Sequence, residues 1–234
     1  MNYNPIIIAL DVESAQEAQQ LVDRLGEAAA FYKVGLELYA AAGMPFVKEL
    51  IAQGKQVFLD LKLYDIGETV KRAVAQIAKV EGIRFVTVHA HPTVMRAAGE
   101  GNTNPSLQIL AVTVLTSWTD ADLAADGHPG TTAELVERRV KNAAECGVKG
   151  IVCSPLEVSH VRKLLGPAAT LVTPGVRSAG ADVGDQKRIA TPAQALENGA
   201  SYLVVGRQVT RAADPASEIR KVYSEIRYGI EKVI

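Results

Sequence analysis

The sequence predicts an α/β protein, a (β/α)8 TIM barrel formed by one domain over residues 1–234. Eight short apolar runs rich in β-branched residues recur at intervals of roughly 20–40 residues. Segments with helical apolar spacing lie between them. Strict alternation of strand and helix implies parallel strands with right-handed crossovers, and eight such units fit a chain of this length. An open doubly wound sheet is less favoured, because no Gly-x-Gly-x-x-Gly motif opens a first helix.

The predicted strands are short and mostly apolar, as expected for a sheet covered on both faces. In chain order they are Ile6–Asp11, Tyr32–Leu38, Gln56–Leu63, Arg84–His89, Gln108–Leu115, Gly150–Ser154, Thr170–Thr173 and Tyr202–Val205.

The clearest predicted helix covers Ser14–Leu25, where the apolar positions form one stripe. Ser14 is the expected N-cap, and Glu17, three residues later, is its capping-box partner. Similar spacing predicts helices over Thr69–Val80, Thr131–Cys146 and Thr191–Asn198.

The composition excludes several classes of protein. The chain is 48% hydrophobic and 22% charged with a formal net charge of −1, which gives no electrostatic basis for nucleic-acid binding. No apolar run approaches the roughly 20 residues of a membrane-spanning helix, and the N-terminus has no basic segment typical of a signal peptide. Cys146 and Cys153 have neither a metal-site spacing nor a disulfide framework. We therefore expect a cytoplasmic protein without membrane association.

Three charged residues lie on or just after the predicted strand Gln56–Leu63. Asp60 and Lys62 are two residues apart, so both side chains are expected on the same face of the strand. Charges in a buried strand are costly unless they are paired, and Asp65 follows closely. The cluster indicates either a structural ion pair or a lysine held protonated for catalysis.

The other candidate residues lie at the carboxyl ends of the predicted strands, where barrel enzymes have their active sites. Two of these ends combine glycine with arginine, which is typical of phosphate binding. They are Pro174-Gly175-Val176-Arg177 and Gly206-Arg207. The segment from Arg177 to Arg188 is polar and glycine-rich, and it indicates either a lid over a phosphorylated substrate or an ordinary surface loop.

His89 and His91 end the fourth predicted strand. They are expected to pack or to line the substrate site. A metal site is less favoured, because no third imidazole lies near them in sequence and Lys62 would repel a cation.

The segment Asp60-Leu61-Lys62-Leu63-Tyr64-Asp65-Ile66 resembles the D-x-K-x-x-D-I signature of the orotidine 5′-monophosphate decarboxylase family. Blocks along essentially the whole chain resemble the family in the same order. They are Ala9-Leu10-Asp11, Tyr32-Lys33-Val34-Gly35, 112–117, 172–177, Gly184-Asp185-Gln186-Lys187-Arg188 and 204–207.

The resemblance implies a homodimeric barrel, without cofactor or metal, that converts orotidine 5′-monophosphate to UMP and carbon dioxide, the last step of pyrimidine nucleotide synthesis. It implies that Lys62 donates a proton within an array of Lys33, Asp60, Lys62 and the partner subunit's Asp65. It further implies a set of residues that bind substrate. They are Asp11 and Lys33 at the ribose, Thr116 or Ser117 at the base, Thr69 reaching the partner's site, and Pro174, Arg177, Gln186, Gly206 and Arg207 around the phosphate and base.

The chemistry of the residues agrees with this implication. Loss of carbon dioxide from C6 of a uracil ring leaves a carbanion in the ring plane, and an adjacent ammonium both stabilises and protonates it. Two alternatives remain. One is a magnesium-dependent sugar-phosphate decarboxylase or aldolase of the same kind of barrel, in which Lys33 would replace an acidic metal ligand. The other is a barrel that binds a phosphorylated ligand without catalysis.

Overall fold

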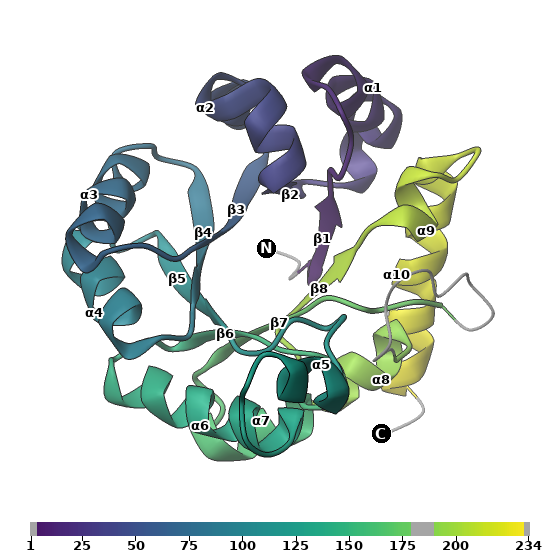
Figure 1. Ribbon diagram of the computed structural model, residues 1–234. Helices are drawn as coiled ribbons and strands as arrows, with labels where there is room; N and C mark the ends of the chain where they lie inside the picture. The colour runs from purple at the N-terminus through teal and green to yellow at the C-terminus, as the bar shows by residue number, and fades with distance from the viewer. Residues whose placement is uncertain (1–3, 179–189, 232–234) are drawn as a thin grey trace.

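The structure, a computed structural model, describes residues 4–178 and 190–231, with side chains as far as residue 226. Eight parallel strands form a closed barrel in sequential order, each paired with the next and β8 paired with β1 (Figure 1). The (β/α)8 fold predicted from the sequence is therefore confirmed. The strands are β1 (Ile6–Ala9), β2 (Phe31–Gly35), β3 (Gln56–Leu63), β4 (Ile83–His89), β5 (Gln108–Val112), β6 (Gly150–Val152), β7 (Thr170–Thr173) and β8 (Tyr202–Val205).

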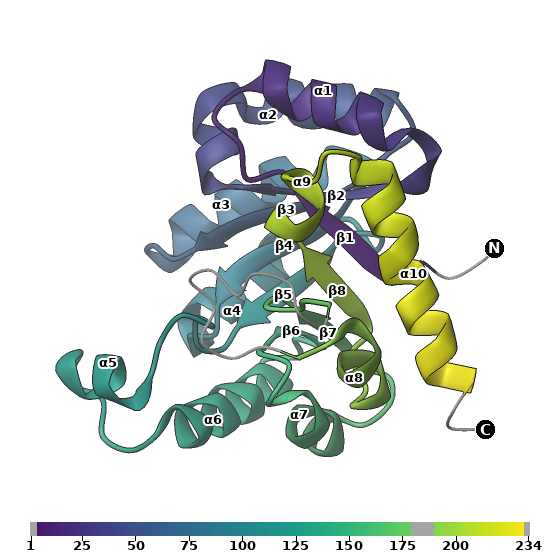
Figure 2. The ribbon, with the colours of Figure 1, turned by 90° about the vertical axis from the view of Figure 1, so that its right-hand side faces the viewer.

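Helices surround the strands, and α5 lies outside the ring, beyond the end of β5 (Figure 2). No helix among the described residues is long and apolar enough to cross a membrane. The helices are α1 (Ala15–Leu25), η1 (Gly26–Ala28), α2 (Leu36–Ala52), α3 (Gly67–Ala78), α4 (Pro92–Gly101), α5 (Asp120–Ala125), α6 (Thr132–Glu145), α7 (Val158–Leu165), α8 (Pro192–Glu197), α9 (Arg207–Thr210) and α10 (Pro215–Glu231).

The helix starts follow local capping chemistry, with one correction. The Ser14 hydroxyl accepts the backbone N–H of Glu17 at 3.2 Å, as predicted for an N-cap. The Glu17 carboxylate does not complete the box, however, because it accepts the N–H of Glu13 at 3.3 Å. Thr131 and Thr191 form complete capping boxes at the starts of α6 and α8.

Four strands end earlier than predicted. Two of them stop two residues early, at Ala9 in place of Asp11 and at Val152 in place of Ser154. The other two stop three residues early. The strand predicted over Tyr32–Leu38 ends at Gly35, and α2 starts at Leu36, which is exposed. The strand predicted over Gln108–Leu115 ends at Val112. In both cases the apolar run continues past the last ladder pair, so hydrophobicity alone extended the predicted strands too far.

The barrel interior is filled unevenly along its axis. At the N-terminal ends of the strands, Phe31 and Phe85 pack with ring centroids 5.4 Å apart, and Tyr202 packs against Phe85 at 5.2 Å. Phe58 also packs against Phe85, at 5.9 Å. These four rings fill the interior of the barrel near its N-terminal end, and we call them the aromatic floor. At the C-terminal ends the inward positions include the small side chain of Ala9, which leaves room for a cavity.

Candidate active site

A cavity of about 460 Å³ opens at the C-terminal ends of the strands. Residues from several separate strand ends contribute to its wall, as is usual for the active sites of (β/α)8 barrels. Ten of the residues predicted from the sequence line it. They are Asp11, Lys33, Asp60, Lys62, Thr116, Ser117, Pro174, Arg177, Gly206 and Arg207.

Carboxylates and ammonium groups alternate along one wall of this cavity. The Lys33 ammonium lies 2.8 Å from the Asp11 carboxylate and 3.7 Å from that of Asp60. The Lys62 ammonium lies 2.9 Å from the same Asp60 oxygen, Oδ2. We call Asp11, Lys33, Asp60 and Lys62 the charge array. Asp60 is its centre, because its carboxylate contacts both lysines.

The charge array lies directly above the aromatic floor of the barrel. Lys33, Asp60 and Thr87 each follow a phenylalanine by two residues on their strands, so they occupy the next inward layer. Lys33 and Asp60 are each 8% exposed, and Thr87 is fully buried. The aromatic rings therefore exclude water from beneath the charged groups, which strengthens their electrostatic interactions.

Burial and pairing compete in setting the ionisation of the array. Burial by itself raises the pKa of Asp60, but the neighbouring Lys33 and Lys62 ammonium groups hold it below its usual range. Burial lowers the pKa of Lys33, but the Asp60 and Asp11 carboxylates more than offset this and raise it. Both groups are therefore ionised near neutral pH.

Strand β3 is irregular at the array, which the simple alternation predicted from the sequence missed. Leu59 pairs with Val86 of β4 and Leu63 pairs with Val88, with a register shift between these pairs. Lys62 adopts a φ of 48°, the left-handed region that residues with a Cβ rarely occupy. A bulge of this kind redirects a side chain, and such bulges are common beside active sites.

Thr87 is a site residue that sequence analysis did not identify. Its hydroxyl donates to Asp60 Oδ1 at 2.9 Å and accepts the backbone N–H of Lys62, also at 2.9 Å. The signal in the sequence was a single polar residue within the apolar run Phe85-Val86-Thr87-Val88.

Gly35 allows Lys33 and Asp11 to approach each other. A Cβ at this position would lie 3.0 Å from the Lys33 Nζ and 3.2 Å from the Asp11 Oδ1. A larger residue would press on the ion pair, so the glycine that ends β2 gives the two side chains room to meet.

Arginines line the part of the cavity formed after β7 and β8, and we call this part the arginine wall. Arg177 is 7% exposed, and Arg207 begins α9 directly after Gly206. Gly175 has a φ of 79°, so the turn after β7 needs a residue without a Cβ. Arg211, one helical turn after Arg207, also lines the cavity and was not predicted. This wall suits an anionic group of a ligand.

The loop after β5 contributes both Thr116 and Ser117 to the cavity lining. Thr119, the third hydroxyl in this loop, instead caps α5, where its hydroxyl accepts the Asp122 N–H and donates to the Asp122 carboxylate. The Arg139 guanidinium from α6 donates to the backbone carbonyl of Thr113 and so supports the start of the loop.

Three predicted site residues lie elsewhere. Asp65 and Thr69 are exposed and do not line the cavity of their own chain, and the Asp65 carboxylate accepts the N–H of Ile66 at 2.6 Å. Gln186 and most of the segment predicted as a lid lie outside the described residues. Arg177, at the start of that segment, donates its backbone N–H to the carbonyl of Ala190 at 3.1 Å.

His89 and His91 form an aromatic group with Tyr64 and not a cluster of metal ligands. The Tyr64 ring meets those of His89 and His91 edge-on, with centroids 5.7 Å and 5.9 Å apart. Across residues 4–178 and 190–231, no three His, Cys, Asp or Glu side chains gather as a metal site would require. The packing role expected for the histidines agrees with this geometry.

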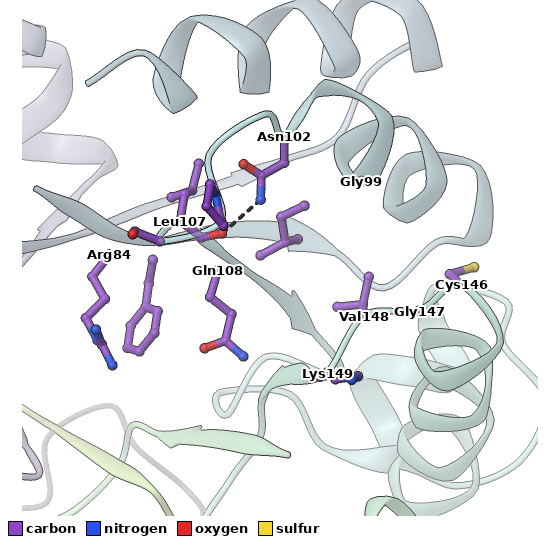
Figure 3. Close-up of a pocket in the computed structure, with 13 residues that line it drawn as sticks. Arg84, Gly99, Asn102, Leu107, Gln108, Cys146, Gly147, Val148 and Lys149 are labelled. Atoms are coloured by element: carbon purple, nitrogen blue, oxygen red, sulfur yellow. Dashed lines mark hydrogen bonds between the residues drawn. The ribbon is translucent and has the colours of Figure 1, made fainter. Parts of the chain in front are cut away.

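A second cavity, of about 510 Å³, lies at the N-terminal ends of β4, β5 and β6 (Figure 3). Arg84, Gln108 and Lys149 contribute polar side chains to it, and no carboxylate among the described residues lines it. The Arg84 guanidinium lies 5.7 Å from the centroid of the Phe85 ring and 3.4 Å from the Tyr202 hydroxyl. These contacts tie Arg84 to the aromatic floor.

The closed parallel barrel and the charged cavity at the C-terminal ends of its strands define a (β/α)8-barrel enzyme whose cavity is lined in part by arginines. Residues 4–222 match the model of the orotidine 5′-phosphate decarboxylase / HUMPS family, and the chain belongs to this family.

Curated relatives and solved structures agree with this assignment. The chain is 52% identical to orotidine 5′-phosphate decarboxylase from Bradyrhizobium sp., over 97% of this chain and 93% of that protein. It is 50% identical to the enzyme of the same name from Rhodopseudomonas palustris, over 94% of each. The crystal structure of orotidine 5′-phosphate decarboxylase from Lactobacillus acidophilus matches with a TM-score of 0.83 and 36% identity, over 95% of this chain and 98% of that one. These relatives are carboxy-lyases.

Proposed function

We propose that the protein decarboxylates orotidine 5′-monophosphate to UMP and carbon dioxide, the final step of de novo pyrimidine nucleotide synthesis. The observation that carries the proposal is the position of Lys62. Its ammonium is held 2.9 Å from a buried carboxylate in a cavity whose other wall presents arginines. The relatives of the same name, at about 50% identity, support the same reaction.

In the proposed reaction, the bond between C6 and the carboxylate carbon breaks and its electron pair stays on C6. The Lys62 ammonium stabilises the developing negative charge and then transfers a proton to C6, which gives UMP. Neutral Lys62 regains its proton from water. Asp60 holds the Lys62 ammonium in place before the reaction, at 2.9 Å from its carboxylate.

The proposed substrate contacts follow the two walls of the cavity. Asp11 and Lys33 bind the ribose hydroxyls, and Thr116 or Ser117 binds the edge of the pyrimidine. The phosphate lies at the arginine wall. Its proposed partners are Pro174, Arg177, Gln186, Gly206 and Arg207.

We further propose that two copies of the chain share their active sites. Asp65 lies between Tyr64 and Ile66, which are 64% and 77% exposed, large apolar side chains that a second copy would cover. In a two-fold dimer each partner offers the same surface to the other. Asp65 and Thr69 of one subunit would then complete the charge array of its partner.

The proposed reaction is tested by following the ultraviolet absorbance of the orotate ring after mixing enzyme with orotidine 5′-monophosphate. We expect the absorbance to change with turnover, and to do so equally after dialysis against a strong chelator. No absorbance change with correctly folded protein would contradict the proposal.

The chelator also tests the magnesium-dependent alternative, which the comparisons do not support. In that alternative an acidic ligand would stand at the position of Lys33, whose ammonium here lies between two carboxylates. Activity that requires added magnesium would favour the alternative.

Cytoplasmic location and a single domain over residues 1–234 stay predictions.

Shared active sites are tested by mixing two inactive variants, Lys62→Ala and Asp65→Asn, under conditions that exchange subunits. A mixed dimer has one site with both Lys62 and the partner's Asp65, so equal mixing should restore about a quarter of wild-type activity. No recovery in a mixture shown to contain mixed dimers would contradict the proposal.

A further inference from the structure

The bulge in β3 places three residues opposite one. Between the register pairs Leu59–Val86 and Leu63–Val88, β3 carries Asp60, Leu61 and Lys62, whereas β4 carries Thr87 alone. Regular pairing cannot satisfy the backbone groups of such a segment, and an unpaired buried N–H is unfavourable. The single residue opposite the bulge is therefore placed to stabilise it.

The Thr87 hydroxyl forms hydrogen bonds to the residues at both ends of the bulge. It accepts the Lys62 backbone N–H at 2.9 Å, where a strand carbonyl would otherwise be the acceptor. It donates to Asp60 Oδ1 at 2.9 Å, which leaves Asp60 Oδ2 for the Lys62 ammonium, also at 2.9 Å. One fully buried hydroxyl thus contacts the backbone of the lysine and the side chain of the aspartate.

The conformation of Lys62 makes this support necessary. A lysine at a φ of 48° is strained, and surrounding interactions must hold such a residue in place. The Lys62 side chain is 29% exposed and long, so its own packing does not fix it. Its position depends on the backbone conformation and on the Asp60 carboxylate, and Thr87 holds both.

We infer that Thr87 is a positioning residue for the reaction: its hydroxyl holds the β3 bulge in the conformation that aims the Lys62 ammonium into the cavity. The expected effect of Thr87 on turnover rests on the proposed function, whereas its expected effect on the position of Lys62 does not. Thr87 acts through Asp60 and Lys62 and does not line the cavity itself.

The test compares Thr87→Val, which keeps the shape of the side chain and removes the hydroxyl, with Thr87→Ser, which keeps the hydroxyl. Thr173→Val is the matched control, since Thr173 is a fully buried strand threonine whose hydroxyl has no hydrogen-bond partner among the described residues. We expect Thr87→Val to lower kcat on the order of 10²-fold with KM near that of the wild type, because a misplaced catalytic group costs about this much. Thr87→Ser should recover most of the loss, and Thr173→Val should turn over normally.

The inference is overturned if folded Thr87→Val turns over like the wild type, or if Thr87→Ser is as slow as Thr87→Val. If Thr87→Val does not fold, Thr87→Ser and Thr87→Ala are compared instead. A much higher kcat for Thr87→Ser than for Thr87→Ala then supports the inference, and equal kcat values overturn it.

A structural measurement separates this inference from the proposed function. If the wild-type protein does not decarboxylate orotidine 5′-monophosphate, the proposed function fails, but the crystal structure of Thr87→Val still tests the role of the hydroxyl. We expect Lys62 to leave the left-handed region and its Nζ to move away from Asp60. An unchanged Lys62 φ and ion pair in that structure would contradict the inference.

Discussion

The two ends of the barrel both present arginine and lysine around a cavity, but they differ in what accompanies the cations. At the C-terminal end, Lys33 and Lys62 flank the buried Asp60 carboxylate at 3.7 Å and 2.9 Å. At the N-terminal end, Arg84 and Lys149 line a cavity of similar size with no carboxylate among its described lining residues. Cavity size therefore does not locate the chemistry in this protein. The chemistry is located by the pairing of buried charges and by the strained backbone of Lys62.

The physical reason for the difference lies in the layers of the barrel. Aromatic rings fill the interior near the N-terminal end, and the Arg84 guanidinium lies over the Phe85 ring, 5.7 Å from its centroid. The layer above them is polar, and its charged groups are shielded from water on one side. A charge that is desolvated and paired interacts strongly with a reacting group, whereas an exposed one is screened.

The largest effect is expected at the centre of the charge array. Lys62→Ala removes both the electrostatic stabilisation of the carbanion and the proton donor, so kcat should fall on the order of 10⁴-fold or more. Binding of UMP should persist, because the arginine wall is intact. Steady-state kinetics and calorimetric titration with UMP check the two parts, and substantial turnover would exclude Lys62 as the proton donor.

A smaller effect is expected at the arginine wall. Arg207→Ala should weaken binding of the substrate phosphate by roughly 10- to 100-fold, which corresponds to the loss of a hydrogen bond to a charged group. The change should appear in KM for orotidine 5′-monophosphate. The control is orotidine without phosphate, whose turnover should be nearly the same in wild type and variant. Equal losses with both substrates would count against a phosphate-binding role.

His89 provides a pH-dependent comparison within the C-terminal end. Burial, the nearby Arg139 guanidinium and the Lys62 ammonium lower the pKa of His89, and the Asp60 carboxylate only partly offsets them. The unfolded chain then takes up a proton near pH 6.5 while the folded protein does not. Stability should therefore fall as the pH decreases below about 6.5 and level off once the folded protein is also protonated.

The control for this pH effect is His89→Gln. Urea unfolding measured between pH 8 and pH 5 should show a shallower loss of stability in the variant than in the wild type. An identical pH dependence in both proteins would contradict the lowered pKa of His89 that burial and the nearby cations produce.

The smallest effect is expected at the N-terminal end. Arg84→Ala and Lys149→Ala should leave kcat and KM for orotidine 5′-monophosphate unchanged within error, singly and together, because neither cation is near the charge array. Thermal unfolding should change only slightly for the exposed Lys149. A marked loss of turnover would show that the two ends are not independent.

The sequence predicted the fold, because periodicity and alternation determine which elements form and in what order. It also placed Asp60, Lys62 and the two Gly-Arg strand ends at one rim, because parallel strands in a barrel share their direction. The β3 bulge and the role of Thr87 could not be predicted in this way. Both depend on the register between β3 and β4, which local patterns in the sequence do not specify.

Asp65 illustrates a different limit. The sequence places it five residues after Asp60, close enough to suggest a single cluster, yet in the chain it is exposed and hydrogen-bonded to its own backbone neighbour. Its proposed role lies across a dimer interface, and a pattern within one chain does not specify which subunit a side chain serves.

The most direct test of the account is a crystal structure of the protein with UMP bound. We expect the nucleotide in the cavity at the C-terminal ends of the strands, with its phosphate at Arg207 and C6 of the uracil ring about 3.5 Å from the Lys62 Nζ, within the range of reacting atoms. UMP bound in the N-terminal cavity, or in the C-terminal cavity with C6 directed away from Lys62, would contradict the account.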